Sequence, residues 1–226
     1  MLQAVLFDVD FTIAKPGPDL GPEGYRRLGS RFGLDLDPSR YAEARAHAVE
    51  TLERHPELDH DEEVWVLFTE QIIRGMGGGS DRTYECAVEM TRAWEHAHNF
   101  QIFDDVLPVL TELRDRRLKL GLVSNTGRDL DVFVAHHGLD VDAVVASGAH
   151  GKTKPHPTIF MAALERLGVS PPDAVMVGDS VEDDVDGARA VGMRGVLLDR
   201  ENRYPEIAEK LTDLRALPAA LGLPPQ

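Results

Sequence analysis

Short apolar runs alternate with amphipathic segments over most of the chain. Apolar runs of this length, without polar alternation, are typical of strands that are buried on both faces of a sheet. Four runs are clear, and the run Ala143–Ala146 is weaker than the others. We therefore expect strands over Leu2–Phe7, Leu118–Val123, Ala143–Ala146, Ala174–Val177 and Gly195–Leu198.

The segments between these runs have helical spacing. Gly138 and Gly168 stand where two of the helical patterns stop, and glycine is the common residue just past a helix end. Strands that alternate with helices predict an α/β fold, here a doubly wound parallel sheet of the Rossmann-like type. The helices expected in this part of the chain are Val106–Arg117, Asp129–Gly138, Pro157–Gly168 and Val185–Gly192.

Residues 15–99 break the alternation, because they contain no convincing strand. We interpret this segment as a small all-helical domain inserted after the first strand. The core domain would then consist of residues 1–14 and 100–226. The helices expected in the insertion are Gly21–Phe32, Tyr41–His55, Glu62–Arg74 and Asp81–His98.

The charge of the chain narrows the functional classes. The 226 residues include 39 Asp and Glu against 24 Lys and Arg, which gives a formal net charge of −15. This excess argues against binding nucleic acid or an anionic membrane surface. A small phosphorylated substrate remains compatible, because a metal ion and a few local cations can reverse the field in one pocket. The single cysteine, Cys86, excludes an intrachain disulfide, and no signal-peptide or membrane-spanning pattern is present, so we expect a cytoplasmic protein.

Polar side chains gather where the expected strands end. Asp8 and Asp10 follow the first run, Ser124 and Asn125 follow the second, and Asp179 follows the fourth. Ligands of open α/β sheets bind at the carboxyl ends of the strands, so we expect one site there. Two carboxylates held close together raise each other's pKa unless a cation lies between them. A donor set made of oxygens favours a hard cation such as Mg²⁺.

Four motifs along the chain resemble those of the haloacid dehalogenase-like hydrolase superfamily. They are "DVDFT", "SNT", "GKTKP" and "GDSVEDD", and they occur in the family's order, each at a strand end. The helical insertion resembles the mobile cap that this family places between the first strand and the second motif. Phe11 stands where the family most often has glycine, which we expect to affect the turn toward the cap rather than the chemistry.

The resemblance implies a catalytic role for Asp8, Asp10, Ser124 and Lys154, and a role in substrate binding for Ser124, Asn125 and Lys154. Asp8 resembles the nucleophile that forms an aspartyl-phosphate. Asp10 resembles the general acid that protonates the leaving oxygen and then the base that activates water. Ser124, with Asn125 beside it, would bind the phosphoryl group, and Lys154 would neutralise its charge.

The resemblance also implies a Mg²⁺ site. The ion would be held by the carboxylate of Asp8, the backbone carbonyl of Asp10 and the side chain of Asp179. Asp183 and Asp184 both match the acidic fourth motif, and one of them would support the water shell of the metal.

The leading hypothesis is a Mg²⁺-dependent phosphatase that acts on a small phosphorylated metabolite, as a monomer or a homodimer. A phosphomutase, which would pass the phosphoryl group from Asp8 to a second hydroxyl, is the alternative. A haloacid dehalogenase is disfavoured, because those enzymes carry a non-acidic residue at the position of Asp10. A phospho-accepting signalling module is disfavoured, because its phosphorylated aspartate ends a middle strand. We interpret Arg128 as a surface residue at a helix start, with substrate contact as the alternative.

Overall fold

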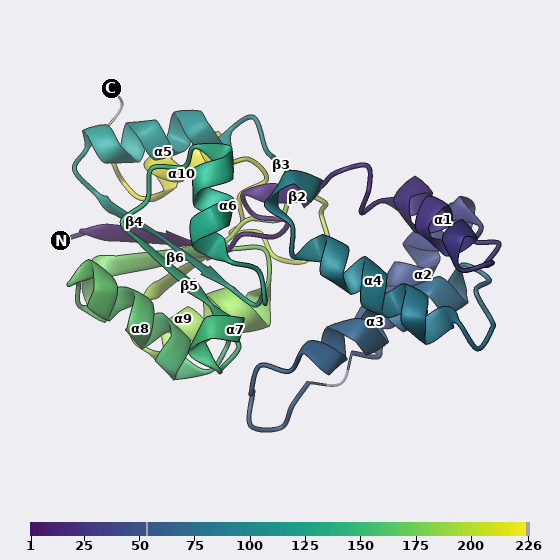
Figure 1. The fold of residues 1–226 in the computed structure, drawn as a ribbon. Coiled ribbons are helices and arrows are strands. Elements are labelled where there is room, and N and C mark those ends of the chain that lie inside the picture. Colours follow the sequence, from purple (N-terminus) through teal and green to yellow (C-terminus); the bar gives the residue numbers. More distant parts are fainter. Residues whose placement is uncertain (53, 225–226) are drawn as a thin grey trace. The chain divides into compact units, whose positions relative to one another are not determined.

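The chain divides into two compact units in the computed structural model, which describes residues 1–52 and 54–224. One unit consists of Met1–Lys15 and Ile102–Gln226, and the other of Pro16–Gln101. Figure 1 shows the elements of both units.

A five-stranded sheet forms the centre of the first unit, with the strand order β5-β4-β1-β6-β7. All neighbouring strands run parallel, which confirms the predicted Rossmann-like α/β fold. The register places Phe7 opposite both Leu122 and Val177, so the three central strands end side by side. The strands are β1 (Ala4–Phe7), β4 (Lys119–Ser124), β5 (Ala143–Ala146), β6 (Ala174–Gly178) and β7 (Arg194–Leu197).

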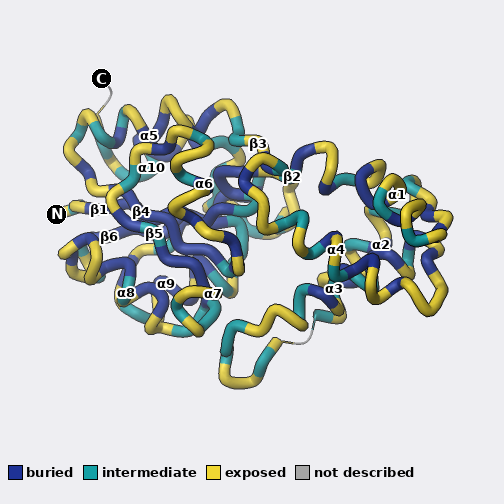
Figure 2. The backbone as a smooth tube through the Cα atoms, in the orientation of Figure 1, coloured by how far each residue is buried: buried dark blue, intermediate teal, exposed yellow. Residues whose placement is uncertain are grey.

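Helices cover both faces of this sheet. In Figure 1, α5 and α6 lie on one side of the strands, and α8 and α9 lie on the other. The strands are the dark blue, buried centre of the unit in Figure 2. The helices are α5 (Val106–Asp115), α6 (Leu130–His137), α7 (Ser147–His150), α8 (Pro157–Leu167), α9 (Gly187–Ala190) and α10 (Leu217–Ala220).

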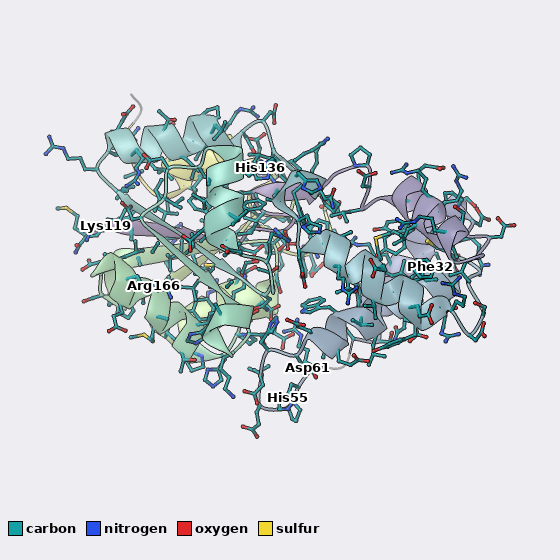
Figure 3. The ribbon with its side chains drawn as sticks, in the orientation of Figure 1. Phe32, His55, Asp61, Lys119, His136 and Arg166 are labelled. Atoms are coloured by element: carbon teal, nitrogen blue, oxygen red, sulfur yellow. The ribbon has the colours of Figure 1, made fainter. Side chains whose placement is uncertain are left out.

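Two cationic side chains link α8 to the sheet through hydrogen bonds. Arg166 on α8 donates to the carbonyl of Val144 on β5, and Lys119 on β4 donates to the carbonyl of Leu167. Both side chains are labelled in Figure 3. The apolar layer between this helix and the strands includes Phe160, which is fully buried. The sheet edge that carries β4 and β5 is therefore held by packing and by polar contacts.

The prediction of a helix over Val185–Gly192 is wrong at its start, because the helical segment begins earlier and its first residues are not α-helical. The segment Val181–Asp186 is instead a π-helical turn, which continues into α9. The side chain of Ser180 accepts the N–H of Asp183 at 3.1 Å, and Asp184 accepts the N–H of Ser180 at 3.0 Å. These side-chain bonds compete with the usual helical pattern and shape the turn locally.

The second unit contains the four helices expected from the sequence. The helix predicted over 41–55 ends at Glu50 in the structure, and position 53 lies outside the described residues. The side chain of Asp61 caps α3 by accepting the N–H of Glu63 at 3.0 Å. No helix in the described part of the chain has the length and apolar character to cross a bilayer. The helices are α1 (Pro22–Arg31), α2 (Tyr41–Glu50), α3 (Glu62–Gly75) and α4 (Thr83–Trp94).

A two-stranded sheet that was not predicted from the sequence lies where the chain passes between the units. Its strands are β2 (Ala14–Pro16) and β3 (Phe100–Ile102). The expectation that residues 15–99 contain no strand is therefore wrong at their first residues. A strand of three residues is too short to show a periodic pattern, which explains the omission.

Candidate functional site

Three carboxylates meet at the carboxyl ends of β1 and β6. Asp8 follows β1, Asp179 follows β6, and Asp184 lies on the π-helical turn. Ligand oxygens of these three residues, here called the carboxylate cluster, lie within 4.8 Å of one another. The structure thus brings together the predicted Asp8 and Asp179. Of the two candidates Asp183 and Asp184, it adds Asp184, which is 1% exposed.

Gly178 makes room for this arrangement. A Cβ atom at this position would lie only 2.1 Å from the Cγ of Asp184, a separation that real side chains do not show. The glycine before Asp179 therefore lets the acid of the π-helical turn approach the end of β6. This is the physical reason for the glycine in the "GDS" part of the motif.

Lys154 is buried between two members of the carboxylate cluster. Its Nζ lies 2.6 Å from Asp8 Oδ1 and 2.6 Å from Asp184 Oδ1, and the residue is 2% exposed. Burial alone would lower the pKa of Lys154, but the charges of Asp184 and Asp8 raise it above its usual value. The amine therefore stays protonated and bridges the two acids.

Asn125 holds the backbone that carries Lys154. Its Oδ1 accepts the N–H of Lys154 at 2.6 Å, and its Nδ2 donates to the carbonyl of Lys154 at 3.1 Å. Nδ2 also lies 3.5 Å from Asp183 Oδ2. This pairing gives Asn125 a positioning task, and its predicted contact with substrate stays a prediction. Ser124 is buried at the end of β4, the strand that pairs with β1 and β5.

The cluster holds more negative than positive charge. Burial raises the pKa of Asp8 well above its usual value, and the charges of Asp184 and Asp179 add to this rise against the opposing charge of Lys154. Burial, with the charge of Asp184, raises the pKa of Asp179 to about 6. Lys154 bridges only two of the three carboxylates, and a cluster that presents only oxygens suits an additional hard cation. The donor set therefore fits the predicted Mg²⁺.

Arg203, from the segment after β7, contacts Asp179. Its Nη2 donates to the carbonyl of Asp179 at 2.6 Å and to the carboxylate of the same residue. Asp199, which is fully buried, holds the segment by accepting the N–H groups of Arg203 and Tyr204 at 2.7 and 2.9 Å. The Nζ of Lys210 lies 2.8 Å from Asp199 Oδ2. This contact was not predicted from the sequence, since nothing in the local pattern indicates it.

The carboxylate of Asp10 faces Arg128 rather than the carboxylate cluster. The guanidinium contacts both oxygens, with distances of 3.1 and 3.1 Å to Oδ1 and 3.0 Å to Oδ2. Arg128 is 2% exposed, so its interpretation as a surface residue is wrong. The reason is that a partner 118 positions away compensates its charge inside the fold.

Phe11 adopts a left-handed backbone conformation, with φ at 65°. Its N–H donates to the carbonyl of Ala14 at 2.7 Å, and the N–H groups of Ile13 and Ala14 both donate to the carbonyl of Val9 at 2.9 Å. Glycine adopts this φ without steric cost, which accounts for the glycine expected here from the resemblance. Asp10 lies in this tight turn, two residues after Asp8.

Comparisons with known proteins agree with this geometry. A model of the haloacid dehalogenase-like hydrolases matches residues 2–192. The chain is 30% identical to a glyceraldehyde 3-phosphate phosphatase of Methanopyrus kandleri, over 94% of this chain and 90% of that protein. It is 30% identical to the N-acylneuraminate-9-phosphatase of Mus musculus, over 90% of this chain and 85% of that protein. The crystal structure of a HAD phosphatase from Thermococcus onnurineus matches with a TM-score of 0.66 and 33% identity, covering 98% of each chain.

Proposed function

The chain belongs to the haloacid dehalogenase-like hydrolases and is a phosphatase of that family, and we propose that it cleaves a small phosphomonoester through an aspartyl-phosphate on Asp8. The observation that carries the proposal is the carboxylate cluster with Lys154 buried inside it, at the carboxyl ends of the central strands. The similar proteins that are named phosphatases of small phosphorylated molecules support this substrate class. The cytoplasmic location and the oligomeric state stay predictions from the sequence.

Asp8 is assigned as the nucleophile. Lys154 holds its Oδ1 at 2.6 Å, and we assign the attack on phosphorus to Oδ2. The attack forms the bond between Oδ2 and phosphorus and breaks the bond between phosphorus and the leaving oxygen. Burial keeps solvent away from the carboxylate, which strengthens its electrostatic interactions with a bound phosphoryl group.

Asp10 is assigned as the general acid and base. In the first step its proton goes to the leaving oxygen, which departs as a neutral hydroxyl. In the second step Asp10 takes a proton from water, the water oxygen bonds to phosphorus, and the bond to Asp8 breaks. Inorganic phosphate leaves, and both aspartates return to their starting state.

The remaining site residues bind and neutralise the phosphoryl group in this proposal. Ser124, at the end of β4, is assigned to donate a hydrogen bond to the phosphoryl group. Lys154 is assigned to neutralise the negative charge of that group. Asp8, Asp179 and the backbone carbonyl of Asp10 would hold Mg²⁺, with Asp184 supporting its water shell. Bound Mg²⁺ would supply positive charge that stabilises the transferring oxygens and relieves the repulsion within the carboxylate cluster.

The helical unit Pro16–Gln101 is proposed to act as the cap. It is inserted between β1, which ends before the nucleophile, and the remaining strands of the sheet. The family resemblance supports this role. We propose that its helices and loops select the substrate.

The test is phosphate release from p-nitrophenyl phosphate and from a panel of small phosphomonoesters. The wild-type protein should release phosphate only with Mg²⁺, and Asp8→Asn should lower the rate by at least about 1,000-fold. Asp213→Asn, which changes a partly exposed aspartate that caps a short turn before α10, is the control and should keep the wild-type rate. Release by Asp8→Asn at the wild-type rate would contradict the assignment of the nucleophile.

A further inference from the structure

Arg128 lies inside the first unit with its guanidinium directed at the carboxylate of Asp10. The side chain is 1% exposed, and the guanidinium donates to Asp10 Oδ1 through both Nη1 and Nη2 and to Oδ2 through Nη2. A planar guanidinium that bonds both oxygens of a carboxylate fixes its direction as well as its distance. The side chain of Asp10 keeps 22% of its surface exposed, so the carboxylate is accessible from one side.

The loop after β4 holds Arg128 in this place. Its N–H donates to Thr126 Oγ1 at 3.1 Å, and the carbonyl of Thr126 accepts the N–H of Gly148 at 3.0 Å. The guanidinium carbon lies 5.2 Å from the centre of the Phe133 ring, which is fully buried on α6. These contacts restrain the arginine from its backbone to its charged end.

Asp10 itself stands on a backbone that is fixed by hydrogen bonds. It belongs to the tight turn between Val9 and Ala14, and residue 10 forms an isolated bridge with residue 14. The side chain retains its own rotations, so the turn alone does not fix where the carboxylate points. The guanidinium of Arg128 donates the side-chain hydrogen bonds that hold this carboxylate.

We propose that Arg128 is the positioning residue of the general acid and base, a role that rests on the proposed function of Asp10. The arginine orients the carboxylate so that one oxygen meets the leaving oxygen in the first step and the attacking water in the second. Arg128 does not touch the reacting atoms in this proposal, and it acts through Asp10.

The two chemical steps make the proposal testable. p-Nitrophenolate is a stable anion that leaves without a proton, so the formation of the aspartyl-phosphate from this substrate needs no acid. Hydrolysis of the aspartyl-phosphate needs Asp10 as a base for every substrate. Phenyl phosphate has a more basic leaving oxygen and needs Asp10 in both steps.

The experiment is rapid-mixing kinetics of Arg128→Gln with both aryl phosphates, in the presence of Mg²⁺. We expect the burst of p-nitrophenolate to keep a rate within about threefold of wild type, while steady-state turnover falls about 10- to 100-fold. With phenyl phosphate we expect the burst itself to slow by a similar factor. A preserved burst also shows that the variant is folded and that Asp8 is functional.

Two further variants separate positioning from structural support. Arg128→Lys keeps the charge but not the planar fork, so its turnover should lie between wild type and Arg128→Gln. Arg114→Gln is the matched control, because Arg114 also pairs with aspartates of the same unit, Asp140 and Asp142, and belongs to no part of the site. It should leave both phases unchanged.

A folded Arg128→Gln that loses both phases with p-nitrophenyl phosphate by the same factor, or loses neither, overturns the proposal. Asp10→Asn in the same assay tests the role of Asp10 separately. If Asp10→Asn loses steady-state turnover and Arg128→Gln keeps it, only the proposed role of Arg128 is wrong. If wild-type turnover does not depend on Asp8 or Asp10, the proposed function fails, and the role of Arg128 fails with it.

Discussion

Buried aspartates occur in two kinds of surroundings within the first unit. In the carboxylate cluster, Lys154 bridges Asp8 and Asp184, and Asp179 contacts the partly exposed Arg203. Asp105 and Asp199 are 0% exposed, but each has a cation of its own and N–H donors from the backbone. Asp105, for example, accepts two bonds from Arg200, at 2.8 and 2.9 Å.

The pKa directions follow this difference. Burial would raise the pKa of Asp105, but Arg200 and a backbone N–H lower it below its usual value. Burial likewise acts on Asp199, and Lys210 with two backbone N–H groups lowers its pKa. The pKa values of Asp8 and Asp179 are raised instead. Burial of an acid therefore does not mark a functional site by itself, whereas a shortage of cations around several acids does.

Replacing Lys154 and Lys210 should give the largest difference in stability between the carboxylate cluster and the well-paired acid Asp199. Lys154→Met leaves the carboxylate cluster without its shared cation and should lower the free energy of unfolding by about 3–5 kcal/mol in metal-free protein. Lys210→Met should cost only about 1–2 kcal/mol, because Asp199 keeps its two backbone donors. Urea unfolding in the presence of a chelator measures both. Equal losses would show that the two places do not differ in charge balance.

Adding Mg²⁺ should affect one place and not the other. An ion that binds the folded cluster stabilises the protein by about 2.7 kcal/mol when its concentration is 100 times Kd. Thermal unfolding at increasing MgCl₂ should show this rise for wild type and for Asp105→Asn. Asp179→Asn should lose most of it. A full Mg²⁺ response in Asp179→Asn would place the ion elsewhere.

The well-paired acids should make the free energy of unfolding depend on pH. The folded pKa of Asp105 is lowered, so its contribution is present above the unfolded value of about 4 and is lost as pH falls through the lower folded value. Asp105→Asn should therefore be about 1.5–3 kcal/mol less stable than wild type at pH 7. The difference should shrink below about pH 4. Urea unfolding from pH 7 to pH 3 checks this, and a constant difference would contradict it.

The sequence predicts the sheet and the strand-end acids because both follow local rules. Apolar runs mark the strands, and parallel strands bring their carboxyl ends to one edge, so Asp8, Ser124 and Asp179 could be placed near one another without coordinates. The choice between Asp183 and Asp184 could not be made this way. It depends on the π-helical turn, whose form comes from side-chain bonds rather than from a hydrophobic period.

The paired cations could not be predicted, because their partners are remote in sequence. Arg128 and Arg200 lie in polar stretches that resemble surface loops, yet each is held by an aspartate about 100 positions away. A buried charge is decided by what the fold brings against it, and a single sequence carries no record of that pairing.

Arg203 contacts both the carboxylate cluster and a well-paired acid, and replacing it has the smallest expected effect. Its backbone is held by Asp199, a well-paired acid, while its side chain, which is 39% exposed, contacts Asp179 in the carboxylate cluster. In metal-free protein this cation supplies part of the positive charge that the cluster lacks. A divalent ion that binds there must compete with it, so Arg203 opposes the binding of Mg²⁺.

Arg203→Ala should therefore bind Mg²⁺ about two- to fivefold more tightly than wild type, a modest gain because exposed ion pairs are worth only about 0–1 kcal/mol. Isothermal titration calorimetry measures the affinity without relying on activity. Arg189→Ala removes the same charge from an exposed pair with Asp186 and should leave Kd within about 1.5-fold of wild type. Unchanged or weaker binding in Arg203→Ala would mean that the arginine helps to shape the metal site. In that case the cluster would depend on two cations, and its contrast with the well-paired acids would be smaller than the carboxylates alone indicate.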